Sequence, residues 1–217
     1  MKKLLTFLSI LLLVASVHSC DLIDAATGKL GGTPSAMGAV GVTVTTSSSP
    51  ISGVSNFTAT VTTSNDGVST YSGSATVTNS ALSTLFTNIP GVSVNGSTVS
   101  TTNMQFKQTT KGLELLSGPT AGIIVNYDSN VGDKYPVGKT GAYREVMTKS
   151  TGDDYSYGFY LIKVLKVEEI VGGVKSAAGI SKITYWANHK YGLVGVQFNF
   201  GDGTFAKFPV YTTAQND

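Results

Sequence analysis

An alternation of apolar and hydroxyl-bearing residues constrains the fold of this chain more than any other feature. From Val40 onward, apolar side chains recur at every second position, as in residues 42–45 (VTVT) and 57–61 (FTATV). A period of two places apolar side chains on one face of a β-strand and polar side chains on the other. Clusters of Ser, Asn, Asp and Gly separate the alternating runs, as turns do. The pattern therefore predicts a sheet with one buried face.

The number and spacing of these runs predict an all-β antiparallel protein, because closely spaced strands joined by short turns pair with their neighbours. Three Ser/Thr-rich strands are expected around residues 42–45, 57–62 and 72–77. Eight further strands are expected over Asn103–Thr109, Leu113–Leu116, Gly122–Asp128, Ala142–Ser150, Tyr155–Ile170, Ile180–Ala187, Leu193–Phe200 and Thr204–Tyr211.

Local signals predict one short helix and two tight turns. Residues 80–88 (SALSTLFTN) have helical spacing of apolar residues, and Ser80 is placed to cap the first turn. Asn95-Gly96 lies between alternating residues and predicts a two-residue hairpin turn. Residues 201–203 (GDG) predict a second hairpin turn between the last two strands.

The first 19 residues are typical of an export signal. Lys2 and Lys3 form a positive start, and an apolar run follows over Leu4–Val17. This run has about 14 residues, whereas a helix that spans a bilayer needs roughly 20. We therefore predict that residues 1–19 are a signal peptide.

Residues 17–20 (VHSC) resemble the lipobox of bacterial lipoproteins, in which a branched apolar residue and a small residue precede a lipidated cysteine. The resemblance implies that Cys20 carries palmitate or similar acyl chains. The residues that follow, up to residue 39, are small, Gly-rich and aperiodic, so residues 20–39 are predicted to be the lipidated cysteine and a flexible tether. The resemblance also implies a membrane-bound protein of the bacterial cell envelope, at the outer membrane or the cell surface rather than at the inner membrane. Cys20 is the only cysteine, so an internal disulfide is excluded.

The charge distribution excludes nucleic acid as a partner. The formal net charge is +2, and Lys2 and Lys3 account for it, so the remainder of the chain is neutral. Residues 40–110 are rich in Ser and Thr and hold only two charged residues, Asp66 and Lys107. We predict one all-β domain over residues 40–213, with an alternative domain boundary near residue 118.

A second resemblance bears on the architecture. The chain is similar to uncharacterised bacterial lipoproteins in two places. In the first, an apolar strand leads into Val131-Gly132-Asp133 and Tyr135, and in the second, Tyr185-Trp186 precede a strand that begins with Gly192-Leu193-Val194. Those proteins resemble the curved half-barrels of periplasmic lipoprotein carriers. The resemblance implies an antiparallel curved sheet, half-barrel or barrel-like, and covers residues 103–211. It concerns turn and core positions and implies no activity.

Residues suited to catalysis or metal binding are few. His189 is the only histidine after the signal peptide and lies in a predicted turn, and the chain has too few Cys and His for a zinc site. Residues 128–133 have oxygen ligands at calcium-like spacing but no Glu at the twelfth position, so we interpret them as an Asx-rich turn. The pairs 153–154 and 168–169 are interpreted as solvated strand ends. No catalytic residue, metal or cofactor is predicted.

Aromatic residues are the candidate ligand site: Tyr155, Tyr157, Tyr185, Trp186 and Tyr191. Such side chains offer apolar area with a polar rim, although they also fill the cores of β proteins. We therefore expect a membrane-anchored, non-enzymatic binding module for an apolar, carbohydrate or protein ligand. The alternative is a structural or adhesive protein of the cell envelope whose Ser/Thr-rich strands offer edges for pairing.

Overall fold

The computed structural model describes residues 29–46, 53–87, 89, 91–118, 120–138, 141–170 and 179–217. The predicted signal peptide, Cys20 and the start of the predicted tether lie outside the described residues. Within the described ranges, strands dominate, and the helical elements are α2 (Ser80–Thr87) and the short 3₁₀ turn η1 (Ala36–Gly38). The prediction of an all-β fold with one short α-helix is confirmed.

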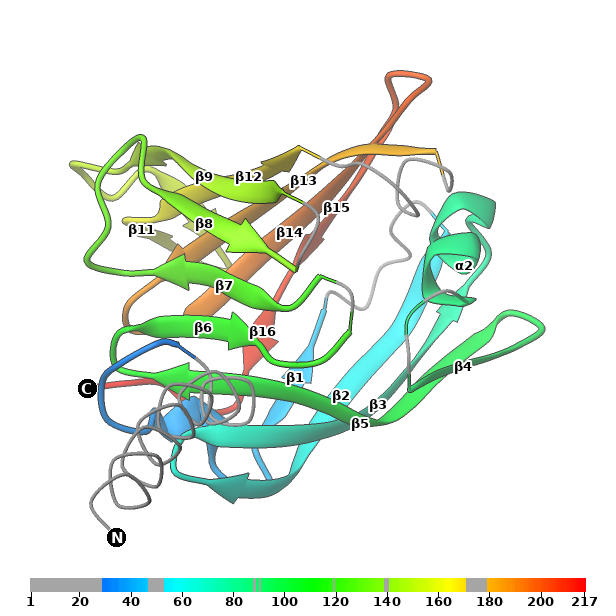
Figure 1. Ribbon diagram of the computed structural model, residues 1–217, viewed down its shortest axis with the longest axis horizontal. Helices are drawn as coiled ribbons and strands as arrows, with labels where there is room; N and C mark the ends of the chain where they lie inside the picture. Colours follow the sequence, from blue (N-terminus) through cyan, green and yellow to red (C-terminus); the bar gives the residue numbers. More distant parts are fainter. Residues whose placement is uncertain are drawn as a thin grey trace, which may run out of the picture.

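The larger of two main sheets, the large sheet, is antiparallel and strongly curved (Figure 1). Its eight strands follow the order β16-β1-β2-β3-β5-β6-β7, with β4 paired to β5 off this path. The strands are β1 (Thr43–Thr45), β2 (Val54–Asn65), β3 (Val68–Val77), β4 (Val92–Asn95), β5 (Thr98–Thr109), β6 (Gly112–Leu115), β7 (Gly122–Asn126) and β16 (Tyr211–Thr212). The large sheet is the predicted half-barrel.

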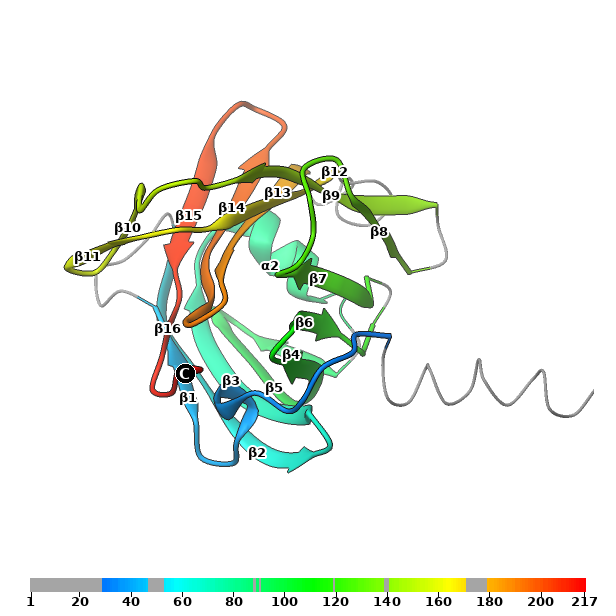
Figure 2. The same ribbon diagram turned by 90° about the vertical axis from the view of Figure 1, so that its left-hand side faces the viewer.

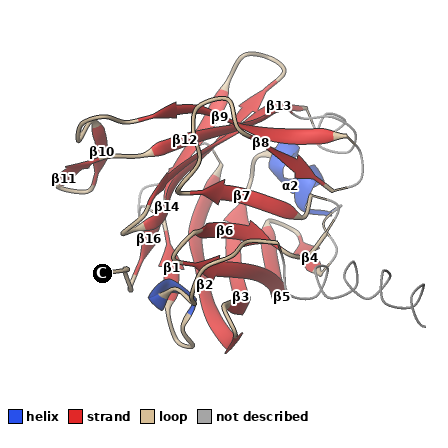
Figure 3. Cartoon of the chain, turned by 60° about the vertical axis from the view of Figure 1, so that its left-hand side comes forward, coloured by secondary structure: helices blue, strands red, loops and turns tan. Residues whose placement is uncertain are grey.

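The second sheet has six strands in the order β15-β14-β13-β12-β9-β8 and faces the concave side of the large sheet (Figure 2). Its strands are β8 (Lys134–Val137), β9 (Ala142–Lys149), β12 (Leu165–Ile170), β13 (Ile180–Asn188), β14 (Gly192–Phe200) and β15 (Phe205–Pro209). A separate hairpin, β10 (Tyr155–Tyr157) with β11 (Tyr160–Ile162), projects from this side of the molecule (Figure 3).

Bulges give the large sheet its curvature. The pairing of β2 with β3 shifts register between Ser55 and Thr58 and again between Val61 and Thr63. An extra residue in one strand bends that strand and increases its twist. Gly73 lies where the strands approach closely, because an added Cβ would be 2.7 Å from the carbonyl oxygen of Thr58. Glycine is therefore required at this bend.

The two sheets share one interior. At one side the chain passes directly from β15 to β16, and Thr46 Oγ1 donates to the carbonyl oxygen of Pro209 at 2.7 Å. At the other side β7 faces β8, where Gly138 N–H donates to the Ala121 carbonyl at 2.8 Å. The largest apolar cluster has members from both sheets and from α2. Residue 118, the alternative boundary, lies between β6 and β7, which are neighbours in the large sheet.

The N-terminal described segment is packed against the body, whereas the sequence placed it in the tether. Leu30 is 3% exposed, and its N–H donates to Glu114 Oε2 at 2.8 Å. Ser35 is buried and donates to Asn216 Oδ1 near the C-terminus at 2.8 Å. The expectation of a tether up to residue 39 is therefore wrong from Leu30 onward, because these contacts fix the segment to β5, β6 and the chain end.

Three local predictions need correction. The expected single strand Tyr155–Ile170 is three strands: a hairpin turn at Gly158, which has a φ of 60°, separates β10 from β11, and residues 163–164 separate β11 from β12. The helix begins with Asn79 as its cap, since Asn79 Oδ1 accepts the N–H of Leu82 at 3.0 Å. The hairpin between β4 and β5 exists, but its two turn residues are 96–97 (GS) rather than Asn95-Gly96, because Asn95 pairs with Thr98.

Candidate apolar binding site

A cavity of about 330 Å³ lies between the concave face of the large sheet and strands β14 and β15 of the second sheet. Sites for small molecules typically have volumes of roughly 300–1,000 Å³. Strands that are far apart in the sequence supply the apolar lining, which includes Ala59, Met104, Phe106, Val196, Phe198 and Phe208. The cavity therefore exists only because the two sheets face each other.

Several lining side chains are only partly buried although they lie on the inner faces of the sheets. Met104 and Phe106 on β5, and Val196 and Phe198 on β14, all have intermediate exposure. In a filled core such side chains would be excluded from water. Their partial exposure agrees with a cavity that is partly open to solvent.

The two ends of the cavity differ in chemistry. At one end α2 contributes Leu82 and Phe86, and Ser100 and Thr101 of β5, which pairs with β4 beside α2, add hydroxyl-bearing residues to a mainly apolar lining. At the other end Met37 of η1 lies with Tyr71 and Gln108. The ends correspond to the positions of α2 and η1 at opposite sides of the view in Figure 1. A bound molecule would therefore meet the phenol of Tyr71 and the amide of Gln108 at only one end.

The polar end holds a neutral pair. Gln108 Nε2 donates a hydrogen bond to Tyr71 Oη. Burial raises the pKa of Tyr71 to about 12, and the hydrogen bond from Gln108 opposes this only in part. The phenol is thus uncharged at neutral pH. Among the described residues, no Asp, Glu, Lys, Arg or His side chain lines the cavity.

The lining of the cavity disfavours charged ligands. A buried ionised group without a partner of opposite charge costs several kcal/mol or more. An apolar molecule, or the apolar part of an amphiphile, loses only its contact with water and gains contacts with the wall. The arrangement can therefore hold a neutral apolar ligand and cannot compensate a buried carboxylate, phosphate or ammonium group.

Of the five aromatic residues predicted as ligand contacts, only Tyr191 lines the cavity. Tyr155 and Trp186 pack together on the outer face of the second sheet, with ring centroids 5.8 Å apart. Tyr157 contacts Tyr191, with centroids 5.1 Å apart. Tyr155, Tyr157, Trp186 and Tyr191 thus pack in one cluster, whereas Tyr185 belongs to the interior between the sheets.

Tyr185 points inward and belongs to a buried polar group. Arg144 is 1% exposed, and its Nε donates to Glu169 Oε2 at 2.9 Å. Tyr185 Oη donates to the same carboxylate oxygen at 3.2 Å. The interpretation of residues 168–169 as a solvated strand end is wrong, because Glu169 faces the interior and Glu168 is held by Lys182 at 3.2 Å.

Arg144 also joins the two sheets. Its guanidinium donates to the carbonyl oxygens of Thr120, Gly122 and Ile123 at 2.9, 3.2 and 3.0 Å. These carbonyls belong to β7 and the residues before it, whereas Arg144 lies on β9. Arginine has five donors in a rigid fork, so a single side chain can take the place of several missing sheet hydrogen bonds.

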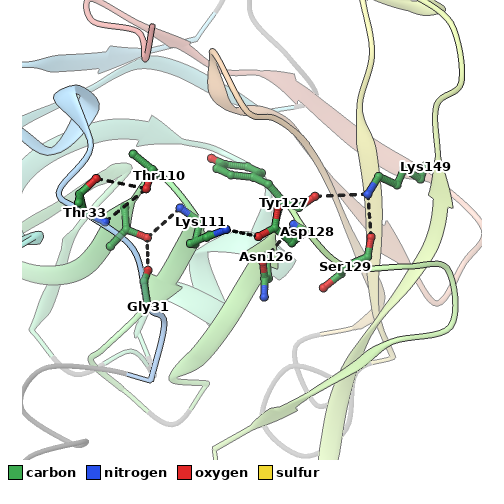
Figure 4. A network of polar contacts seen from close by, with 10 residues as sticks. Gly31, Thr33, Thr110, Lys111, Asn126, Tyr127, Asp128, Ser129 and Lys149 are labelled. Atoms are coloured by element: carbon green, nitrogen blue, oxygen red, sulfur yellow. Dashed lines mark hydrogen bonds and ion pairs between the residues drawn. The ribbon is translucent and has the colours of Figure 1, made fainter.

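The Asx-rich segment 128–133 forms the predicted turn. Asp133 Oδ2 accepts the N–H of Asn130 at 2.8 Å, and Lys111 Nζ lies 2.5 Å from Asp128 Oδ2 (Figure 4). The hydrogen bond from Lys111 holds the pKa of Asp128 below its usual value. In the described ranges, no group of three or more His, Cys, Asp or Glu side chains is placed to hold a metal.

His189 lies exposed in the turn between β13 and β14, as predicted. Its ring packs edge-on against Tyr127, with centroids 5.5 Å apart, and its carbonyl accepts a hydrogen bond from Asn216 Nδ2 at 2.8 Å. These contacts assign His189 to the packing of the C-terminal residues.

The cavity residues were not identified from the sequence. The alternation in β14 did indicate that Val196 and Phe198 share a buried face. Val194 was expected on that face too, but a bulge after Trp186 turns it to the outer cluster. No local signal shows that an inward-facing side chain borders a cavity, because that depends on the opposite wall.

Comparisons of the chain with protein-family models, curated protein sequences and solved structures found no match. In the part of the chain that the structure describes, no helix has the length and apolar character needed to cross a membrane.

Proposed function

We propose that this protein is a non-enzymatic binding module that holds a neutral apolar ligand in the cavity between its two sheets. The observation that carries the proposal is a solvent-accessible cavity of about 330 Å³ with apolar walls and no charged side chain among the described residues. An apolar ligand binds because its surface and the apolar cavity walls are both removed from water, so apolar walls are the main requirement of such a site.

An apolar ligand has more support than a carbohydrate. Sugars are held by several hydrogen-bonding side chains beside an open aromatic face. The aromatic side chains outside the cavity instead contact one another or Lys207, whose Nζ lies 4.5 Å from the centre of the Trp186 ring. The cavity has few hydrogen-bonding side chains in a lining that is mostly apolar.

The alternative of a structural or adhesive envelope protein has less support. An adhesive role through strand pairing needs unpaired strand edges. The Ser/Thr-rich strands β1, β2, β3 and β5 each pair with strands on both sides, and β4 alone of this group pairs on one side. The strands that were expected to offer edges are thus mostly interior to the large sheet.

The proposal includes a lipid anchor at Cys20 and a location in the bacterial cell envelope. It is supported by the signal-like residues 1–19 and the VHSC sequence that follows them. Acyl chains contribute about 0.8 kcal/mol per buried methylene group, so several chains retain a folded domain on a membrane. We expect Cys20→Ser to move the protein from the membrane fraction to the soluble fraction, and unchanged partitioning would contradict the anchor.

The cavity is tested by filling it. Ala59 faces the cavity opposite Gly73, so a phenylalanine ring at position 59 would occupy ligand space. We expect Ala59→Phe to weaken binding of the neutral dye N-phenyl-1-naphthylamine by about tenfold or more, as removal of roughly 1.4 kcal/mol of binding free energy would. The measurement is a fluorescence titration of the full chain.

The matched control is Thr58→Phe, which places the same ring on the adjacent, exposed residue of β2. Thr58→Phe should leave dye binding unchanged. An anionic naphthalene sulfonate of similar size should bind less tightly than the neutral dye, since the described lining has no cation. Equal binding by both variants, with unfolding midpoints like that of the parent, would overturn the cavity as the ligand site.

A further inference from the structure

The β10–β11 hairpin exposes the most apolar surface of any short segment in the described chain. Phe159 at its turn is 103% exposed, and the adjoining Tyr160 and Leu161 are 67% and 60% exposed. Single exposed apolar residues are common on proteins, but three consecutive ones at a projecting tip are not. We call residues 158–161 the hairpin tip.

The hairpin pairs the facing edges of its two strands. Tyr157 pairs with Tyr160 and Tyr155 pairs with Ile162 in an antiparallel register, and Gly158 adopts the positive φ of 60° that a two-residue turn requires. A segment that enters a fully apolar medium needs paired backbone groups, because each unpaired group costs several kcal/mol there. The outer edges of β10 and β11 have no neighbouring strand among the described residues, so the hairpin suits a shallow layer in which water still reaches those edges.

The hairpin carries no charge. Residues 155–162 (YSYGFYLI) contain no Asp, Glu, Lys, Arg or His, whereas Asp154 and Lys163 flank them at the base. Both flanking residues are exposed. Immersion of the tip therefore buries no charged group and leaves both charges at the base, where water remains.

Aromatic contacts hold the base of the hairpin in place. Tyr155 packs on Trp186, and Tyr157 packs on both Tyr191 and Tyr211, with centroids 5.1 and 5.2 Å apart. Ile162 is 7% exposed in the same cluster. Because the base is fixed, the tip is held in one orientation, and binding therefore loses little conformational entropy of the hairpin.

The three apolar side chains do not share one face. Tyr160 and Leu161 are neighbours on a strand, so they point to opposite sides of the hairpin, and Phe159 lies at its end. A flat or grooved protein surface would contact one side of the hairpin only. A fluid apolar layer surrounds the tip and removes all three side chains from water together.

We propose that the hairpin tip inserts into the interfacial layer of a lipid bilayer. Phe159 and Leu161 enter the boundary of the acyl chains, and Tyr160 keeps its hydroxyl group among the headgroups, as tyrosines at membrane interfaces do. A strand rises about 3.3 Å per residue, so the tip reaches about 5–10 Å from its base, which is the depth of interfacial elements. This contact lies outside the cavity and does not depend on the ligand proposed for it.

The test places a tryptophan at the tip. The full-length Phe159→Trp chain is mixed with phosphatidylcholine vesicles whose acyl chains carry bromine, a short-range quencher of tryptophan fluorescence. The matched control is Phe205→Trp, because Phe205 is also exposed, at 57%, but lies on β15. The parent chain, with Trp186 alone, supplies the background signal.

We expect the emission of the tryptophan at position 159 to shift to shorter wavelength and to be quenched, and that of the tryptophan at position 205 to be unaffected. The double variant Phe159→Ser/Leu161→Ser should lower vesicle binding of the Cys20→Ser chain by about tenfold or more, given roughly 1.5–3 kcal/mol per apolar side chain. Equal quenching at both positions, or none at 159, would overturn the proposal. In the second case the tip would contact a partner protein instead.

Discussion

At the scale of single residues, the interior of this protein depends on one charged side chain that the strand pattern does not single out. Arg144 is fully buried and makes contacts with Glu169 and with three carbonyl oxygens of the facing sheet. Two charges removed from water are stable only when their hydrogen bonds are complete. The position of Arg144 at the junction of β7 and β8 therefore couples its ion pair to the closure of the two sheets.

Arg144→Met is expected to lower the free energy of unfolding by about 3–5 kcal/mol, because it leaves Glu169 buried without its cationic partner. Arg144→Met/Glu169→Met should recover part of that loss, since no uncompensated charge remains. Urea unfolding followed by circular dichroism measures both changes.

The control for this prediction is Asp128→Asn. This substitution breaks the ion pair with Lys111. The side chain of Lys111 is 51% exposed and that of Asp128 is 63% exposed. Exposed pairs contribute little, so its effect should be far smaller than that of Arg144→Met. A loss of less than about 1 kcal/mol for Arg144→Met would show that the pair does not hold the sheets together.

At the scale of elements, tertiary contacts decided the boundaries that local signals left ambiguous. The aromatic run Tyr155–Ile170 has strand propensity throughout, but Gly158 breaks it and Trp186 provides a surface on which the first half folds back. Asn79 and Ser80 are both good helix caps, and the position of Asn79 at the end of the preceding loop decided between them. Propensity alone does not distinguish such neighbours.

The N-terminal segment around η1 packs against the body of the protein. A substitution at Leu30 tests whether this packing contributes to the free energy of unfolding. Leu30→Ala is expected to lower the free energy of unfolding by about 2–4 kcal/mol, because the side chain is 3% exposed and its removal leaves a void. Val40→Ala, at a residue 63% exposed, is the control and should have little effect. If both variants unfold at the same urea concentration as the parent, residues 29–39 contribute nothing to stability.

At the scale of the whole molecule, two curved sheets produce a cavity that neither contains alone. One wall comes from strands before residue 116 and the other from strands after residue 191. The Ser- and Thr-rich strands of residues 40–110 all belong to the large sheet, whereas the second sheet is built from strands that begin at Lys134 or later. Ser35 and Asn216 then join the two ends of the described chain.

The sequence by itself determined the all-β class, the single α-helix and most strand positions, because a two-residue period and turn residues are local properties of the chain. It also indicated the inward faces of strands such as Val196–Phe198 in β14. Only the tertiary structure decided which inward side chains fill the core and which, like Met104 and Phe198, border a cavity. Whether an inward side chain fills the core or borders the cavity depends on the space between two walls whose residues are far apart in the sequence. Bulges at positions such as Gly73 set that space.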